Sequence, residues 1–549
     1  MKFAAYIWSI ILLIGIMFTS CERDDDERDD SSRFEIDTTN VYVDNAYENK
    51  LKDSVWYYFR VLSLWENVLT PTNFDLHKMD SLNYLKDNYT KYFQTPGDII
   101  GYLKYLTKAS VVGNSVSPNA GSGNNYSFYE DILYSHKKGE SRAYDWYSFL
   151  DRGGFVSGAL QKGYLSGYGM DLSYLQTNPN SSNANLYIRF VEKNSVAYKA
   201  GLRRGHQIIS LDDDTKIDYD SQKGNNFNTL NNYLYNSTLK VEYKTPEGQT
   251  HVANLEYAYN RFADPIFVDT VLDLGTQKVG YIGISSFLSS NALITDKGEI
   301  KLFQTRIQDV FNKLSTSNIK DLVVDLRYNG GGSVYTAEIL ADYMAPNSAS
   351  GNLMYTNKIN AILKQAGFDE EGQDFGPIDF SKKGNLNLSK IYFLVSDETA
   401  SASEMLINVL SPHMQVYMIG TYKYENNKTV ANNTYGKPVG FFPQEIVSSN
   451  NLLYVISFQM FNKDKFGDYF DGLKPNTHVW EYKSFLDFGN KDESMLAAAL
   501  DHIRTGSFSS TVSRSVLPNT NLERKFSRDN VGTRKIQGMF KFPTKKIHL

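Results

Sequence analysis

The stretch VDLRYNGGG at residues 324–332 places an apolar strand directly before three glycines. A backbone so free of side chains can approach a ligand closely and point N–H groups at it. The later stretch LVSDETASASE, residues 394–404, gives a strand, a tight turn and the start of a helix. It presents a serine at a helix N-terminus, where backbone N–H groups and the helix dipole favour developing negative charge. These two strand ends predict an α/β domain in which one edge presents a serine and backbone N–H groups that could bind negative charge.

The sequence around these stretches alternates between strand and helix patterns from Lys278 onward. Such alternation predicts layered sheets with helices packed outside them. The predicted strands are Val279–Ile284, Leu322–Leu326, Ile391–Val395 and Val416–Ile419, and the predicted helices are Lys301–Leu314, Tyr335–Tyr343 and Ala402–Leu410.

A β-rich module of ordinary domain size precedes this region, with short strands such as Ala184–Val191 and Leu239–Tyr243. Within it, NSVAYKAGLRRGHQII at residues 194–209 reads as a short helix, a glycine cap and a strand, and it resembles the latter half of a PDZ domain.

A glycine-bearing loop stands upstream of that string, where PDZ domains hold a peptide carboxylate on backbone N–H groups and add the peptide as an extra strand. The alternative is a glycine turn that binds no ligand. The loop consists of Gly167, Tyr168, Gly169 and Met170.

The region from Tyr42 to about Ala109 has helical periodicity, with apolar side chains such as Leu51, Val55 and Phe59. We expect Asp98 to cap a helix over residues 99–106. Residues 111–125, rich in Ser, Asn and Gly, predict an exposed loop.

The composition is that of a globular, multidomain chain. The chain has 549 residues, of which 41% are hydrophobic and 22% charged, so it can bury several cores. Its 57 Lys and Arg against 62 Asp and Glu give a formal charge of -5. This balance provides no field for a polyanion and predicts no nucleic-acid partner.

The N-terminus carries an export signal and the only cysteine. The apolar run of residues 3–20 has the length of a short membrane span or of a signal peptide core, and it ends directly before Cys21. Small residues before a cysteine resemble a bacterial lipoprotein signal with its lipidation site; the alternative is an uncleaved anchor with an incidental cysteine. Residues 22–30 hold seven acids and two arginines, which predicts a solvated tether.

Five motifs in order resemble the carboxyl-terminal processing, or tail-specific, serine protease family. They are the two stretches at 324–332 and 394–404, together with VGYIGISSF at residues 279–287, TYGK at 434–437 and GLKP at 472–475. The resemblance covers about residues 34–504. It implies an α+β multidomain fold with an N-terminal helical domain, a PDZ-like β module and a ClpP/crotonase-like α/β core.

The same resemblance implies the site residues. Ser401 is then the nucleophile, with Ser403 as the weaker candidate, and Lys437 is the general base, which acts only when burial lowers its pKa. The oxyanion would lie between the backbone N–H groups of Ala402 and Gly331. No metal or cofactor is implied.

The sequence departs from the family at several points. An Asn-rich insertion at residues 422–433 lengthens the spacing from Ser401 to Lys437, which leaves Lys423 or Lys428 as other bases. Phe441 stands where the protease branch often has a glutamine that orients the lysine. A Ser-His-Asp arrangement with His413 as base also stays open.

We therefore expect a serine endopeptidase that cleaves protein or peptide substrates, anchored to the outer membrane by a lipid on Cys21 and facing the periplasm or the cell surface. The alternative is a catalytically silent surface lipoprotein that binds peptides or glycans. The oligomeric state stays open. The expected segments are a signal peptide at 1–20, an acidic tether at 21–33, a helical domain with a loop at 34–152, the PDZ-like module at 153–258, the protease core at 259–504 and a basic tail at 505–549.

Overall fold

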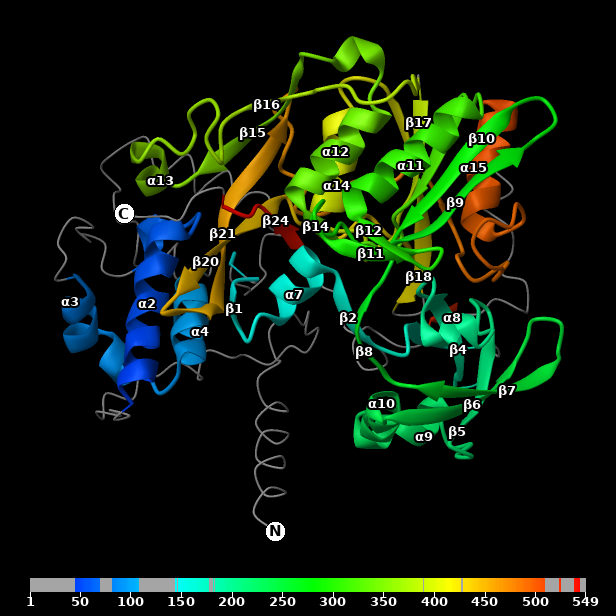
Figure 1. Cartoon of the computed structure of the whole chain (residues 1–549), viewed down its shortest axis with the longest axis horizontal. Coiled ribbons are helices and arrows are strands. Elements are labelled where there is room, and N and C mark those ends of the chain that lie inside the picture. The colour runs from blue at the N-terminus through cyan, green and yellow to red at the C-terminus, as the bar shows by residue number, and fades with distance from the viewer. Residues whose placement is uncertain are drawn as a thin grey trace.

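The computed structural model describes residues 45–69, 81–107, 144–508 (except 146, 177–180, 182, 389 and 426–427), 523–524 and 538–543. The signal peptide, the acidic tether, Cys21 and the loop predicted at residues 111–125 lie outside these residues. The fold is a multidomain α+β arrangement with several sheets: helices of the N-terminal segment at one end, a β-rich module at the other and layered sheets between them (Figure 1). Among the described helices, none combines the length and apolar character needed to cross a membrane.

The N-terminal segment is helical, as predicted. It consists of α2 (Ala46–Leu62), η2 (Glu66–Val68), α3 (Ser81–Asn88), η3 (Thr90–Tyr92) and α4 (Pro96–Leu106). The start of α4 corrects the predicted cap. The helix begins at Pro96, the first-turn position that proline favours, and Thr95 and Asp98 bond reciprocally in a capping box, with Asp98 N donating to Thr95 Oγ1 at 3.2 Å and Thr95 N to Asp98 Oδ2 at 2.8 Å.

The first large sheet contains every strand predicted from residue 278 to residue 419. Its order is β19-β18-β17-β13-β10-β9, with β22 beside β18. The strands β10, β13, β17 and β18 run parallel. Strands β10, β13 and β17 are mostly apolar and buried, as expected for a sheet covered on both faces, whereas β18 is buried only around Ile419 and Thr421. The bounds are β9 (Ile266–Asp273), β10 (Lys278–Ile284), β13 (Asp321–Asp325), β17 (Lys390–Leu394), β18 (Gln415–Glu425), β19 (Lys428–Ala431) and β22 (Thr477–Val479).

Helices cover this sheet on both faces. One face packs on α15, and the other packs on the core formed with α11, α12 and α14 (Figure 1). All three predicted helices are present. The bounds are α11 (Phe303–Thr316), α12 (Val334–Met344), α13 (Ala361–Gln365), η5 (Asn347–Ala349), α14 (Ala402–Leu410) and α15 (Ser494–Thr505).

Residues 422–425 and 428–431 of the Asn-rich insertion are paired antiparallel strands rather than loop. Strand β18 continues to Glu425 and pairs antiparallel with β19. Strand pairing satisfies the backbone of a segment whose Asn and Lys side chains give no strand pattern in the sequence.

A second sheet has the order β14-β24-β20-β21-β15-β16, with β1 beside β21. Its strand β24 comes from the C-terminal region, where the sequence predicts only a basic tail. Three residues are too few to show periodicity, yet all three are buried. The bounds are β1 (Phe149–Arg152), β14 (Gly331–Ser333), β15 (Leu353–Ile359), β16 (Ile378–Asp379), β20 (Val439–Ile446), β21 (Ser448–Asn462) and β24 (Gly538–Phe540).

The β-rich module has its own apolar core. Its main sheet has the order β23-β3-β4-β5-β6-β7, and the short pair β2-β8 joins it to α7 and the central sheets. The helix, glycine cap and strand predicted at residues 194–209 are α8, Gly201 and β5. The bounds are α7 (Phe155–Lys162), β2 (Tyr164–Gly167), β3 (Met170–Gln176), β4 (Asn185–Val191), α8 (Val196–Lys199), β5 (Gln207–Leu211), α9 (Tyr219–Gln222), η4 (Lys223–Asn225), α10 (Asn228–Tyr235), β6 (Thr238–Lys244), β7 (Thr250–Glu256), β8 (Ala258–Phe262) and β23 (Glu523–Arg524). Outside the module, β11 (Leu293–Asp296) and β12 (Glu299–Leu302) form a separate two-stranded sheet.

Candidate active site

Ser401 lies in a sharp turn between β17 and α14. Its backbone has φ 61° and ψ -113°, a region that is costly for a residue with a side chain and that recurs at functional sites. The side chain is fully buried. Ala402, directly after it, is the first residue of α14, so its N–H has no acceptor within the helix.

Glu404 joins the serine turn to the lysine segment. Its Oε2 accepts hydrogen bonds from Ser401 N at 2.7 Å and from Lys437 N at 2.9 Å. Its Oε1 accepts from Gly436 N at 2.7 Å and from Thr434 Oγ1 at 2.5 Å. Complete burial raises the pKa of Glu404, while these four donors favour the carboxylate. One oxygen atom therefore holds the backbones of both predicted catalytic residues.

Lys437 is buried, and its ammonium group lies on aromatic rings. Nζ is 3.9 Å from the ring centre of Tyr147 and 4.1 Å from that of Phe441. The residue that replaces the family's glutamine thus contacts the lysine through its ring face. Gly436, directly before Lys437, has φ 88°, and a Cβ there would lie 2.2 Å from Phe470 O. The approach of the lysine segment therefore requires glycine.

Lys423 lies in the β18–β19 hairpin, on the strand segment that pairs with β19. Among the described residues, the hydrogen bonds to Glu404 come from Ser401, Thr434, Gly436 and Lys437, and Glu404 thus holds the Lys437 backbone directly. Lys437 is therefore the lysine that this structure brings to the serine turn.

Asn329 braces the glycine triplet against the serine turn. Its carbonyl oxygen accepts from Ala400 N at 3.1 Å and from Ser403 Oγ at 3.1 Å. Its side-chain Oδ1 accepts from Gly331 N at 2.9 Å. The hydroxyl of Ser403 is thus bonded to the backbone of Asn329, which leaves Ser401 as the candidate nucleophile of the turn.

The two predicted oxyanion donors lie side by side. A Cβ added to Gly331, whose φ is 103°, would come within 2.9 Å of Ala402 N. Only glycine leaves that space open. Because Gly331 N–H donates to Asn329, it must change its acceptor to bind an oxyanion. Ala402 N–H donates to no backbone oxygen among the described residues.

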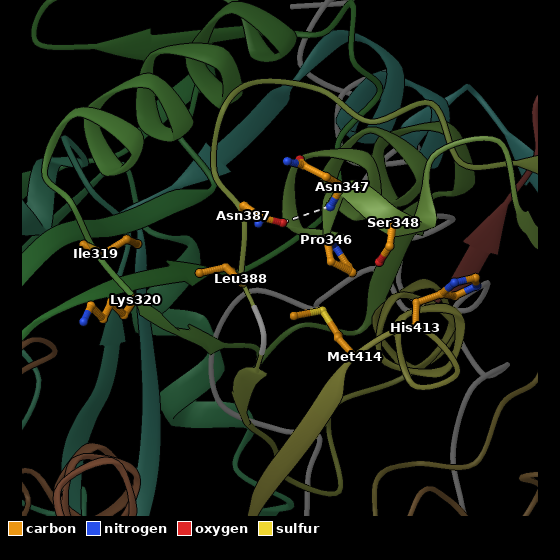
Figure 2. Close-up of a pocket in the computed structure, with 9 residues that line it drawn as sticks. All are labelled: Ile319, Lys320, Pro346, Asn347, Ser348, Asn387, Leu388, His413 and Met414. Carbon is orange, nitrogen blue, oxygen red and sulfur yellow. Dashed lines mark hydrogen bonds between the residues drawn. The ribbon is translucent and has the colours of Figure 1, made fainter.

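His413 is far from this centre. It lies past the C-terminal end of α14, whose nine residues span about 13 Å, and its Nε2 donates to Leu353 O at 3.2 Å. Its side chain lines a cavity of about 660 Å³ at that end of the helix (Figure 2). The geometry excludes His413 as a base for Ser401.

The module is joined to the catalytic loops by buried charges. Arg204 donates to Tyr328 Oη at 2.6 Å and to Glu481 Oε1 at 3.0 Å, and Tyr328 immediately precedes Asn329. Arg189 of β4 forms an ion pair with Glu398 in the serine turn. Opposite charges hold the guanidinium groups ionised and raise the pKa of Arg189, although burial opposes this.

The predicted peptide-binding loop joins β2 to β3. Gly167 and Gly169 have positive φ, and the carbonyl oxygens of Tyr168 and Gly169 accept from Ala197 N at 3.1 Å and Glu192 N at 2.8 Å. These bonds pack the loop against the start of α8. Met170 is the first residue of β3 and is buried.

Across the described part of the chain, no group of three or more His, Cys, Asp or Glu side chains is placed to hold a metal ion. What this centre offers is a serine at a helix start, a buried lysine and backbone N–H groups. This combination suits acyl transfer.

Comparison with known protein families identifies the class of enzyme. Residues 278–451 match the model of Peptidase family S41. The chain carries a serine-type peptidase domain of family S41. That domain includes Ser401, Glu404, Lys437 and the glycine triplet.

Three solved structures are similar to this chain, and the first of them shares its fold. A Bacteroides fragilis NCTC 9343 structure described as an S41 protease has a TM-score of 0.55 at 23% identity, over 82% of this chain and 97% of its own. The photosystem II D1 C-terminal processing protease has a TM-score of 0.39 at 16% identity, over 85% of this chain and 98% of its own. Mature CPAF has a TM-score of 0.33 at 12% identity, over 65% of this chain and 88% of its own. Among curated proteins, none matches this sequence.

Sequence reasoning missed three parts of the S41 site. The serine motif predicts no role for Glu404, although its spacing from Ser401 is that of a capping box and signals a bond back to the serine backbone. Tyr147 and β24 come from distant segments, and no local pattern points to either.

Proposed function

We propose that this protein is a serine endopeptidase of the cell envelope that cleaves protein or peptide chains with a Ser401–Lys437 dyad. The observation that carries the proposal is the shared Glu404 carboxylate, which fixes the backbones of both residues at one point. Such fixed geometry is the main requirement of a nucleophile and its base.

In the proposed reaction, Ser401 Oγ attacks the scissile carbonyl carbon while the neutral amine of Lys437 takes the hydroxyl proton. The oxyanion binds to Ala402 N–H and, after it leaves Asn329, to Gly331 N–H. The C–N bond then breaks, and the leaving amine receives the proton from Lys437. Water then attacks the acyl carbon while Lys437 takes one of its protons. The ester C–O bond breaks, the acid product leaves, and Lys437 returns the proton to Ser401 Oγ.

We further propose that the β-rich module is PDZ-like and presents an extended peptide to this centre. The loop of residues 167–170 and the edge of β3 would hold the peptide as an added strand. The buried contacts of Arg189 and Arg204 support coupling between a peptide on the module and the catalytic loops.

The dyad is tested by hydrolysis of an unstructured protein such as casein by the chain from Ser31 onward. We expect Ser401→Ala and Lys437→Ala each to lower the rate by about a thousandfold or more, because members of such a unit act together. Ser411→Ala, beyond the far end of α14, serves as the matched control. Unchanged cleavage in Ser401→Ala would refute the assignment, and binding without any cleavage would favour a silent binding protein.

The location is proposed from the sequence of residues 1–30: a lipid on Cys21 anchors the protein to the outer membrane, with the folded part on the periplasmic or cell-surface side. Metabolic labelling with a clickable fatty-acid analogue should mark the protein in the membrane fraction. The Cys21→Ser chain should be unlabelled and soluble; a labelled or membrane-bound variant would contradict the anchor.

A further inference from the structure

The C-terminal strand β24 lies directly on the glycine strand of the active site. It pairs parallel with β14, where Gly331 is opposite Gly538, and Gly538 N donates to Gly330 O at 2.9 Å. A Cβ on Gly331 would meet Gly538 O at 2.4 Å and Ala402 N at 2.9 Å. The tail backbone and the predicted oxyanion donor thus border the same glycine.

The backbone of a substrate would have to lie where β24 now lies. For its carbonyl to lie between Ala402 and Gly331, an extended chain must pass along β14 and bond to it backbone to backbone. The edge of β14 is already paired with β24, which also contacts β20 on its other side. Ser401 is fully buried in this arrangement.

We propose that the slot between β14 and β20 is the binding site for the extended backbone of the substrate, and that residues 538–543 occupy it in cis and hold the enzyme at rest. This inference rests on the proposed function. An unfolded chain enters only when it displaces the tail.

The C-terminal region also pairs with the edge of β3, the second sheet edge on which a peptide strand could be added. Strand β23 (Glu523–Arg524) pairs antiparallel with β3, where Glu523 is opposite Gln176 and Arg524 opposite Leu175. Strand β3 follows the loop of residues 167–170, so β23 stands on the edge where the module would add a peptide strand. Strand β24 thus lies on the glycine strand, while β23 lies on the edge of β3 at the end away from the loop of residues 167–170.

The contacts of β24 indicate which chains fit the slot. The ring of Phe540 stacks on Phe441 with 5.1 Å between ring centres and packs on Tyr454 at 5.6 Å. Met539 is fully buried. The slot therefore takes an extended chain with aromatic or large apolar side chains, which a folded protein hides and an unfolded one exposes.

The experiment compares the full chain with one that ends at Gly506, using casein hydrolysis and labelling by a fluorophosphonate probe. A chain that ends at Thr544 retains β24 and is the matched control. We expect the chain ending at Gly506 to cut casein about tenfold faster or more, since each tenfold reflects about 1.4 kcal/mol of tail binding. The synthetic peptide of residues 535–544 should then inhibit it competitively, and a scrambled peptide should not.

A purely structural strand gives the opposite result. The shortened chain would then be slower, and the peptide would restore activity rather than inhibit, which would overturn the proposal. If the shortened chain fails to fold, Gly538→Pro in the full chain replaces it, because proline removes the N–H that donates to Gly330. Faster casein cleavage and labelling by Gly538→Pro support the proposal, and unchanged or slower rates refute it.

Failure of the proposed function is recognised separately. If neither chain cuts casein, fluorescence anisotropy measures binding of the labelled peptide to the chain ending at Gly506. Binding that unfolded casein displaces supports the slot without catalysis. A peptide that does not bind, or that casein does not displace, refutes the slot.

Discussion

At the scale of single residues, Glu404 organises the site although it touches no reacting atom. It is fully buried and accepts hydrogen bonds from Ser401 N, Lys437 N, Gly436 N and Thr434 Oγ1. Three of these donors are backbone N–H groups that cannot reverse their role. The site therefore needs a group that accepts at both oxygens.

Glu404→Gln tests this role, because an amide NH2 cannot accept and leaves two donors facing it. We expect a loss of stability of about 1–3 kcal/mol and a fall in kcat of about tenfold or more with little change in KM. Thermal unfolding and steady-state hydrolysis measure both. Glu445→Gln, the same change at an exposed position of β20, is the control; equal kcat in both variants would contradict the role.

At the scale of elements, much of the fold could be predicted and some of it could not. The sequence predicts the four parallel strands of the first sheet from short apolar runs and the three helices from their periodicity, but it does not predict β9, β19 or β22. The hairpin at residues 422–431 and the three-residue β24 form through pairing with distant strands, which no local pattern records. Within the site, Ser401 and Lys437 follow from motifs, whereas the contact with Tyr147 depends on tertiary packing.

The contact between η2 of the N-terminal segment and the start of α13 predicts a dependence of stability on pH. Glu66 of η2 accepts from Ala361 N, at the start of α13, at 3.1 Å. Burial raises the pKa of Glu66 from 4.5 to about 7. The folded state thus binds the extra proton, and the resulting stability is complete below about pH 4.5 and lost as the pH rises through about 7.

Glu66→Gln keeps an acceptor for Ala361 N without a charge. We expect this variant to exceed the parent in free energy of unfolding by about 1–3 kcal/mol at pH 8 and to equal it near pH 4.5. Urea unfolding at both pH values measures the difference. Parallel pH profiles for the two proteins would show that Glu66 is not the titrating group.

At the scale of the whole molecule, the module and the peptidase domain share one buried ionic cluster. Arg204 bonds Tyr328 and Glu481, while Arg189 lies over the Tyr328 ring at 4.5 Å and pairs with Glu398. Tyr328 precedes Asn329, which holds Gly331, and Glu398 lies in the serine turn. A shift of the module would therefore displace both the glycine strand, through Tyr328, and the serine turn, through Glu398.

Arg204→Met and Tyr328→Phe, singly and together, measure this coupling. Arg204→Met removes the guanidinium that bonds the buried Glu481 carboxylate, so we expect a cost of about 3–5 kcal/mol and a coupling energy with Tyr328 of about 0.5–3 kcal/mol. The rate per fluorophosphonate-labelled site should fall with KM unchanged, because the glycine strand loses its register. Arg203→Met is the control, since the Arg203 guanidinium donates to Tyr198 O and Leu202 O and lies over the Tyr198 ring, all within the β-rich module. If stability falls but the rate per labelled site is kept, the cluster only holds the domains together and does not position the catalytic loops.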